Sequence, residues 1–448
     1  MFKRTHLHIV AGLALLPLIQ TSYGVDLLQI YQQAQQHDAT FQQAAATYEA
    51  AKESLPIARA ALLPSVTLTA NTTINYQNTT PFHYNSNGYT LTLTQPVINL
   101  SAWGLYSQAH ITVAEAALTF GQAQQQLIID VVTAYFNVLE AQEKFSYAKA
   151  YQAQLQQQLN QTQEQYKVGL KAMTDVQSTK ASYETAVADT ISAQNSLDNT
   201  FEQLTQITGV VETDLTPLAE NAPLIKPVPA SADAWVNAAL QGNIALQTAH
   251  LQADFAKTGV HVAQLGNGSV PGYFPTLNAV GTKAFSRTHN EDIGSNPSSS
   301  GSNTQSAGLS LSYSLFNGGS TYYTVQQATY TAQSSEFSLE QTRRQTISNT
   351  RQGYLNILSD ISQVEAFKQA MLSGESSLQA ITAAYNVGTR TIVDLLTQQS
   401  NLFNSQQQYA SARYQYILDS VQLKADTGLL SPSDVVAINQ WLSPITAS

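Results

Sequence analysis

The sequence predicts a mixed α/β membrane protein that arose by internal tandem duplication. Three observations predict this class. Long segments without proline predict unusually long α-helices, while short segments in which apolar residues alternate with Thr and Ser predict β-strands. Both kinds of segment recur in the same order in the two halves of the 448-residue chain. Each element is taken below in chain order.

Residues 1–24 predict a secretory signal peptide. Lys3 and Arg4 form a positive start, residues 9–19 are apolar, and Ser22 and Gly24 occupy the small-residue positions before a cleavage site. The alternative, a membrane anchor, has an apolar run that is short for a bilayer. Losing Lys3 and Arg4 with the peptide changes the formal charge from −10 to −12.

The mature sequence excludes several classes of protein. Its acidic balance argues against nucleic-acid binding, which needs a basic patch. The absence of cysteine excludes disulfides, thiolate metal sites and a lipid-modified cysteine, and the eight histidines of the full sequence, two of them in the signal peptide, form no ligand cluster. We therefore expect no metal and no cofactor. No run of 18 apolar residues follows the signal, which leaves the periplasm, the exterior, or an outer membrane entered through β-strands.

The duplication is visible in short phrases that recur at a nearly constant offset. YKVGLKAMTD (166–175) and YNVGTRTIVD (385–394) start 219 residues apart, and each contains Tyr, Val, Gly, a base two residues after the Gly, and Asp. The same offset relates AYFNVLEA to GYLNILSD and Gly209 to Gly428. We predict a first repeat at 25–215, a linker at 216–232, a second repeat at 233–430 and a tail at 431–448.

The first repeat contains five predicted elements. A helical stretch comes first, and Pro64 separates it from two strands of roughly ten residues that flank the polar loop 78–87. The long helices have no proline, and a Gly at 169 divides them. The predicted ranges are 26–55 for the helical stretch, about 65–97 for the two strands, and 101–165 and 172–208 for the helices.

The second repeat follows the same plan. A less regular helical stretch precedes Pro275, and two strands flank the longer polar loop 287–305. Two helices without proline follow, divided at Gly388. The predicted ranges are 233–265 for the helical stretch, about 276–286 and 307–316 for the strands, and 320–384 and 391–427 for the helices.

These elements predict an oligomer. Four strands cannot close a membrane barrel, since the smallest have eight strands, and open strand edges in lipid leave backbone groups unpaired. If these strands lie in a membrane, several protomers must therefore share one barrel, although this reasoning does not fix their number. Helices of about 100 Å with so few apolar residues must also pair along their length, as coiled coils do.

The double plan, the AYFNVL and QITG segments and above all YNVGTRTIVD resemble the TolC-type outer-membrane channels, the outer membrane factor family of Gram-negative bacteria. The resemblance covers essentially the whole mature chain. It implies a homotrimer with a 12-stranded β-barrel, four strands per chain, continued by a long α-helical coiled-coil tunnel in the periplasm, with 431–448 in an equatorial segment.

The resemblance also implies what the protein does. Such channels are not enzymes. They are exit ducts of tripartite export systems that conduct drugs and secreted proteins. The implied partners are a periplasmic adaptor (membrane fusion) protein, an inner-membrane RND pump or ABC exporter, and outer-membrane lipid. The sequence does not separate multidrug efflux from type I secretion.

The repeated phrase has two interpretations. Gly169 and Gly388 can end one helix before the next begins, so a plain helical hairpin without further role explains the phrase from its residues alone. The resemblance implies a periplasmic gate instead. In that gate Tyr385 and Arg390 would bond to Asp175, and Arg390 would also reach Thr174, either within one protomer or between protomers. We call these four residues the latch.

The resemblance assigns two further groups of residues. Asp394 would form a ring of three carboxylates at the tunnel entrance, without the second acidic ring of close family members, because Thr397 stands at that position. The turns would receive the adaptor. Their residues are Val168, Gly169, Leu170, Val387, Gly388 and Thr389, and we call them the tip turns.

A secreted structural coiled-coil protein, such as a filament subunit or an adhesin, is the competing class. It would share the signal peptide and the long helices rich in Ala, Gln and Ser. It would not need two matched pairs of strands at equivalent places in a duplicated chain.

Overall fold

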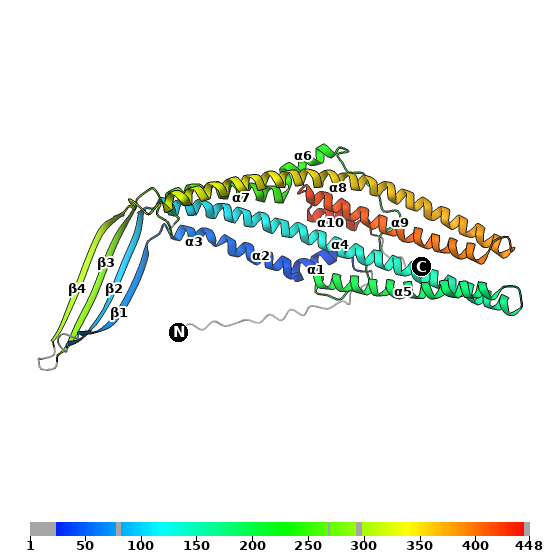
Figure 1. Cartoon of the computed structure of the whole chain (residues 1–448), viewed down its shortest axis with the longest axis horizontal. Helices are drawn as coiled ribbons and strands as arrows, with labels where there is room; N and C mark the ends of the chain where they lie inside the picture. Colours follow the sequence, from blue (N-terminus) through cyan, green and yellow to red (C-terminus); the bar gives the residue numbers. More distant parts are fainter. Residues whose placement is uncertain (1–23, 78–81, 268, 293–297, 443–448) are drawn as a thin grey trace, which may run out of the picture.

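The structure is a computed structural model that describes residues 24–442 except 78–81, 268 and 293–297. The predicted signal peptide lies outside these residues apart from Gly24. A sheet occupies one end of the molecule, and long helices run side by side away from it to the opposite end (Figure 1). None of the helices described is both long enough and apolar enough to cross a membrane.

Four antiparallel strands form the sheet in the order β1-β2-β3-β4. Their bounds are Ser65–Gln77 for β1, Phe82–Ile98 for β2, Thr276–Asp292 for β3 and Ser298–Ser312 for β4. The two strands of each repeat pair with each other, and β2 pairs with β3 across the repeats. The strands β1 and β4 therefore form the edges of the sheet within one chain.

One face of the sheet is apolar and exposed. Val66 pairs with Leu93, Leu68 with Leu91, and Leu277 with Leu311, so that these side chains share a face. The alternate residues are mostly hydroxylic, and they include Thr67, Thr69, Thr90, Thr92 and Thr282. Apolar side chains that no part of the chain covers indicate a surface that lies against lipid or a partner.

The strands are longer than the sequence predicts. They span 13 to 17 residues rather than about ten, and they extend into segments assigned to polar loops, since β2 begins at Phe82 and β3 continues to Asp292. The ladder needs only backbone groups, and hydroxyl and amide side chains also bond across it: Thr72 Oγ1 donates to Asn87 Oδ1 at 2.6 Å. In contrast, β4 ends at Ser312, so the strand predicted at about 307–316 extends four residues too far.

The helices of the first repeat line up along one long rod. Short helices α1 (Leu27–His37), α2 (Ala39–Lys52) and α3 (Ser54–Ala60) follow each other beside α4 (Leu100–Lys167), and α5 (Met173–Thr208) packs on the far part of α4 (Figure 1). The predicted continuous stretch at 26–55 is thus broken at Asp38. Its side chain accepts from the backbone N–H of Phe41 at 2.6 Å, which starts a new helix there.

The second repeat has the same arrangement. Helices α6 (Ala232–Gly242) and α7 (Ile244–Leu265) lie along α8 (Ser320–Asn386), and α9 (Ile392–Asp426) packs on the far part of α8 (Figure 1). Asn243 breaks the predicted stretch at 233–265, because its side chain accepts from Leu246 N–H at 2.9 Å. The chain ends with α10 (Pro432–Asn439), near the middle of the rod. We call α4–α5 the first coil and α8–α9 the second coil.

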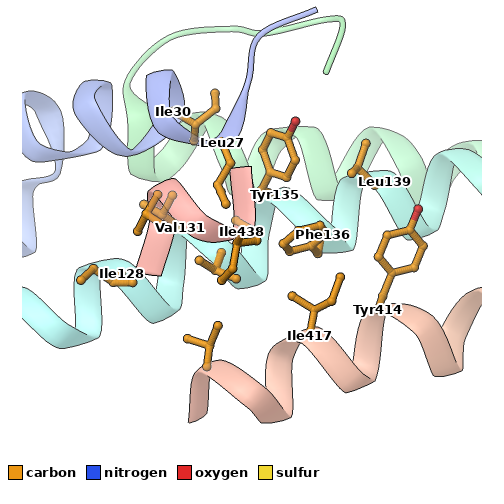
Figure 2. Close-up of a cluster of buried hydrophobic side chains, with 14 of the residues drawn as sticks. Leu27, Ile30, Ile128, Val131, Tyr135, Phe136, Leu139, Tyr414, Ile417 and Ile438 are labelled. Carbon is orange, nitrogen blue, oxygen red and sulfur yellow. The ribbon is translucent and has the colours of Figure 1, made fainter. Parts of the chain in front are cut away.

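The largest core lies midway along the helices, where α1, α4, α9 and α10 meet (Figure 2). Tyr135 and Phe136 of α4 are fully buried there, among Leu27, Ile417 and Ile438. The Tyr135 hydroxyl donates to the carbonyl of Thr216 at 2.7 Å, so it ties the linker to the core. Burial raises the pKa of this hydroxyl well above its usual range, because an anion would be desolvated.

Replacing Tyr135 with phenylalanine is expected to lower the free energy of unfolding by about 1–3 kcal/mol, because the buried Thr216 carbonyl loses its donor. Tyr354, its counterpart in the second repeat, is the control: it is also buried, but its hydroxyl makes no hydrogen bond with any described residue. Thermal or urea unfolding of the two variants measures the difference. Equal losses at Tyr135 and Tyr354 would contradict the prediction.

Candidate functional site at the helix tips

The two tip turns lie at the end of the molecule opposite the sheet (Figure 1). Gly169 and Gly388 have φ angles of 76° and 81°, in the left-handed region that side chains disfavour. After each glycine a backbone N–H bonds back around the helix end: Leu170 N–H to Gln165 O at 2.8 Å, and Thr389 N–H to Ala384 O at 2.9 Å. Both turns thus end their long helices in the same way.

The tip turns present apolar side chains to solvent. Val168, Leu170 and Val387 are between 71% and 76% exposed. Removing apolar side chains from water is energetically favourable. Three exposed apolar side chains at one end of the molecule therefore indicate a contact surface for another protein chain.

Asp394 forms a capping box with Thr391 at the start of α9. Its Oδ2 accepts from the Thr391 backbone N–H at 3.0 Å, and its own N–H donates to Thr391 Oγ1 at 3.2 Å. The bonds that the Asp394 carboxylate accepts from the Thr391 backbone N–H and from the Thr391 hydroxyl, and then the charge of Arg390, hold the pKa of Asp394 below its usual range. The carboxylate is therefore ionised at neutral pH.

Asp175, the counterpart of Asp394 in the first repeat, has different surroundings. Ala172 stands where the second repeat has Thr391, and it makes no side-chain cap at the start of α5. The Asp175 carboxylate makes no hydrogen bond or ion pair with any described residue. The two repeats therefore use the same Asp differently: one carboxylate caps its own helix, and the other is available to a partner.

Within one protomer the latch bonds are not made. Tyr385 is 3% exposed, and its hydroxyl has no hydrogen-bond partner among the described residues. Across the same part of the chain, Arg390 forms no ion pair, and no bond joins it or Tyr385 to Asp175 or Thr174. The predicted latch bonds are thus absent among the described residues of a single chain.

A residue that sequence reasoning missed does join the two tips. The ammonium nitrogen of Lys171, in the turn of the first coil, lies 4.3 Å from the centre of the Tyr385 ring. The signal was present, because Lys171 is the base two residues after Gly169 and is thus the counterpart of Arg390. Its partner could not be read from the sequence, because nothing local links Lys171 to a tyrosine of the other repeat.

Behind the tips a small apolar cluster holds the two coils together. Leu155 and Ala186 of the first coil pack with Ile392, Leu395 and the Tyr385 side chain of the second. Farther from the tips, Tyr151 of α4 stacks on Phe403 of α9 with ring centres 4.8 Å apart. Beside this stack a polar groove runs between α5 and α9, and Thr397 lines it with Ser178, Ser182, Asp189 and Asn401.

Two carboxyl groups meet inside the second coil. Asp360 of α8 is 9% exposed, and it faces Asp419 of α9. Burial first, and then the neighbouring Asp419 carboxyl, raise the pKa of Asp360 to about 7. This pair lies among the apolar contacts between α8 and α9, far from the tips.

Replacing Asp360 with asparagine is expected to raise the melting temperature by a few degrees at pH 8 and to change it less at pH 5. The pKa of Asp360 is raised by folding, so the native chain loses stability as pH rises from about 4 to 7, and asparagine removes that loss. Asp198, which bonds only to Gln194 on its own helix, provides the control variant Asp198→Asn. An equal change at both pH values would contradict the prediction.

Comparisons with known proteins agree with this architecture. The family model described as outer membrane efflux protein matches residues 30–210 and 235–429, one segment in each half of the chain. Outer membrane protein TolC of Escherichia coli (strain K12) is 35% identical over 98% of this chain and 89% of that protein. Alkaline protease secretion protein AprF of Pseudomonas aeruginosa is 27% identical over 95% of this chain and 89% of that protein.

Solved structures show the same fold. The CmeC outer membrane channel of Campylobacter jejuni superimposes with a TM-score of 0.76 at 15% identity, covering 98% of both chains. The outer-membrane channel OprN gives 0.75 at 18% identity, covering 90% of this chain and 89% of that one. These matches confirm the fold class predicted from the sequence, in which each chain contributes four strands and a long helical tunnel segment.

The matched proteins are outer-membrane channels, which sets aside the alternative of a filament subunit or adhesin. Members of this family are not enzymes. The protein is located in the outer membrane of a Gram-negative bacterium, and its helices extend into the periplasm. The family model covers most of both repeats, and the TolC relative matches nearly the whole chain. The chain belongs to the outer membrane efflux protein family.

Proposed function

We propose that this protein is the exit duct of a tripartite export system, that it works as a homotrimer, and that its helix tips form the gate. One observation carries the proposal: an exposed apolar sheet face continues directly into helices that reach a shared tip about 100 Å away. A sheet of this kind suits a bilayer, and helices of this length suit a passage across the periplasm. The chain then conducts passively, and a transporter elsewhere supplies the energy.

The open edges of the sheet support the proposed homotrimer. Strands β1 and β4 have no neighbour on their outer sides within the described part of the chain, and unpaired backbone groups in lipid cost several kcal/mol each. Three copies joined β4 to β1 give a closed barrel of twelve strands, four from each chain. The apolar face then lies against outer-membrane lipid, and the face with Thr67, Thr69, Thr90 and Thr92 lines a polar lumen.

The latch would close this duct between protomers. Among the described residues, Arg390 and the Asp175 carboxylate form no ion pair, and the Tyr385 hydroxyl has no hydrogen-bond partner. A trimer would bring Arg390 and Tyr385 of one tip to Asp175 and Thr174 of the next. An arginine–carboxylate bond is directional and charge-assisted, yet it breaks when water or a partner competes. Asp394 of each chain would then form the entrance carboxylate ring.

The tip turns would dock the adaptor. Exposed Val168, Leu170 and Val387 are suited to an apolar contact, and the open glycine positions 169 and 388 leave room for a close backbone approach. The inner-membrane component would be an RND pump or an ABC exporter. The cargo would be drugs, secreted proteins or both, since relatives include proteins named for protease secretion and structures named as outer-membrane channels.

Two measurements test this function. The purified full-length protein should migrate as a heat-modifiable trimer from outer-membrane fractions and should form discrete conducting channels in planar lipid bilayers. Deleting the gene should then raise drug susceptibility, abolish export of a secreted protein, or both, and these outcomes separate the two cargo classes. Soluble filaments, or the absence of any conductance, would overturn the proposal.

A further inference from the structure

The side chain of Tyr385 is the point where the two coils meet at the tip. It lies in the last turn of α8 and is almost fully buried, in a cluster with Leu155 of α4 and Leu395 of α9. The first coil supplies Leu155 and Ala186 to this cluster and so helps to cover the ring. Any movement that separates the coils must therefore uncover this ring.

The residue that reaches the ring from the first coil is Lys171. Its ammonium group lies over the ring at 4.3 Å from the centre, well within the range of a cation–π contact. A neighbouring lysine behaves differently: Lys167 pairs with Glu164 on its own helix at 2.7 Å. Lys171 has no such carboxylate partner among the described residues, so the Tyr385 ring is its contact.

Tyr385 thus offers two separate contacts. The face of its ring binds Lys171 within the chain, and its hydroxyl has no partner among the described residues. Because the two groups are at different positions on the side chain, one can be removed without the other. Replacing Tyr385 with phenylalanine keeps the ring face, while leucine removes it and keeps an apolar side chain of useful size.

We propose that Lys171 is a second gating residue, which holds the Tyr385 ring and so ties the tip of the first coil to that of the second within each protomer. This inference rests on the proposed function, because it assigns a role in the same gate. The Lys171 contact acts inside one chain, whereas the latch of Arg390 and Asp175 acts between chains. Opening then requires both to break, so each should contribute separately to the closed state.

The experiment uses the full-length protein in planar lipid bilayers. Lys171→Met keeps the length of the side chain and removes its charge. It is expected to increase the conductance, or the fraction of time spent open, by about twofold to fivefold, because the ring face of Tyr385 no longer binds a cation. Lys171→Arg should preserve the native behaviour, because a guanidinium also binds a ring face. Lys167→Met is the matched control, because it removes the same charge close to the same turn. It should have no effect, since Lys167 pairs with Glu164 and not with the Tyr385 ring.

A pair of double variants tests whether Lys171 acts through the ring. Lys171→Met should add nothing to Tyr385→Leu, which already lacks the ring, but should still raise the conductance of Tyr385→Phe. Unchanged conductance in Lys171→Met, in a protein whose Arg390→Ala variant opens, would overturn the role of Lys171 and leave the channel function intact. Equal increases in Lys171→Met and Lys167→Met would overturn it too. If the native protein forms no channel at all, the proposed function itself fails.

Discussion

The Arg390→Ala variant is expected to conduct several-fold more than the native protein in planar lipid bilayers. In the native trimer the Arg390 guanidinium of each tip is proposed to bond to Asp175 of the next, and no partner within the described part of the chain competes for either group. Alanine removes three such bonds at once. Single-channel conductance at fixed voltage and salt concentration measures the change.

Three further variants identify the bond involved. Asp175→Asn should reproduce the effect, because it removes the other partner of the same pair. Arg390→Lys should give an intermediate conductance, since lysine keeps the charge but lacks the fork that binds both carboxylate oxygens. Arg344→Ala is the control, because Arg344 pairs with Glu340 on the same helix, far from the tip. Native conductance in Arg390→Ala would remove Arg390 from the gate.

The Asp394→Asn variant is expected to require at least about tenfold more of a divalent or trivalent cation for half-maximal block of the channel. The proposed ring would place three carboxylates around a narrow entrance, where they would attract multivalent cations, and asparagine would remove all three charges. Asparagine is preferred over alanine because its side-chain oxygen can still accept from Thr391 and so keep the start of α9. Titration of the conductance with the cation measures the block.

Thr397 allows the opposite change. It lies three residues after Asp394 on α9, and Thr397→Asp would add a second ring of carboxylates. This variant should be blocked at lower cation concentration than the native protein. Native sensitivity in both Asp394→Asn and Thr397→Asp would place the cation site elsewhere in the tunnel.

Much of this fold could be predicted because local residue patterns determine its long helices and strands. A helix over Leu100–Lys167 needs only the absence of proline and a glycine that can take positive φ at its end. The turns at Asp38 and Asn243 were missed because these residues can lie within a helix as well as cap one, and no proline stands beside either of them. The strands were underestimated because their outer parts are polar and resemble loops.

The contacts of the candidate site were harder to predict, because they join residues that are far apart in the chain. The phrase around Gly388 indicated which residues belong to the candidate site. It did not indicate that Thr391 bonds to Asp394, or that Ala172 provides no cap for α5. The contact between Lys171 and Tyr385 and the pairing of Asp360 with Asp419 depend on how two coils align. A repeat in the sequence shows what the two halves share, whereas the candidate site depends on where they differ.

The open edges of the sheet have a genetic consequence. A chain that leaves β1 and β4 unpaired relies on its neighbours to complete its own secondary structure. When a chain with a damaged β1 edge is produced beside the native one, every mixed trimer contains at least one faulty joint. Such an allele should therefore be dominant-negative, whereas an allele that makes no protein should be recessive. Expressing each allele together with the native gene would then test the barrel joint, because only a chain that still enters the trimer can inactivate it.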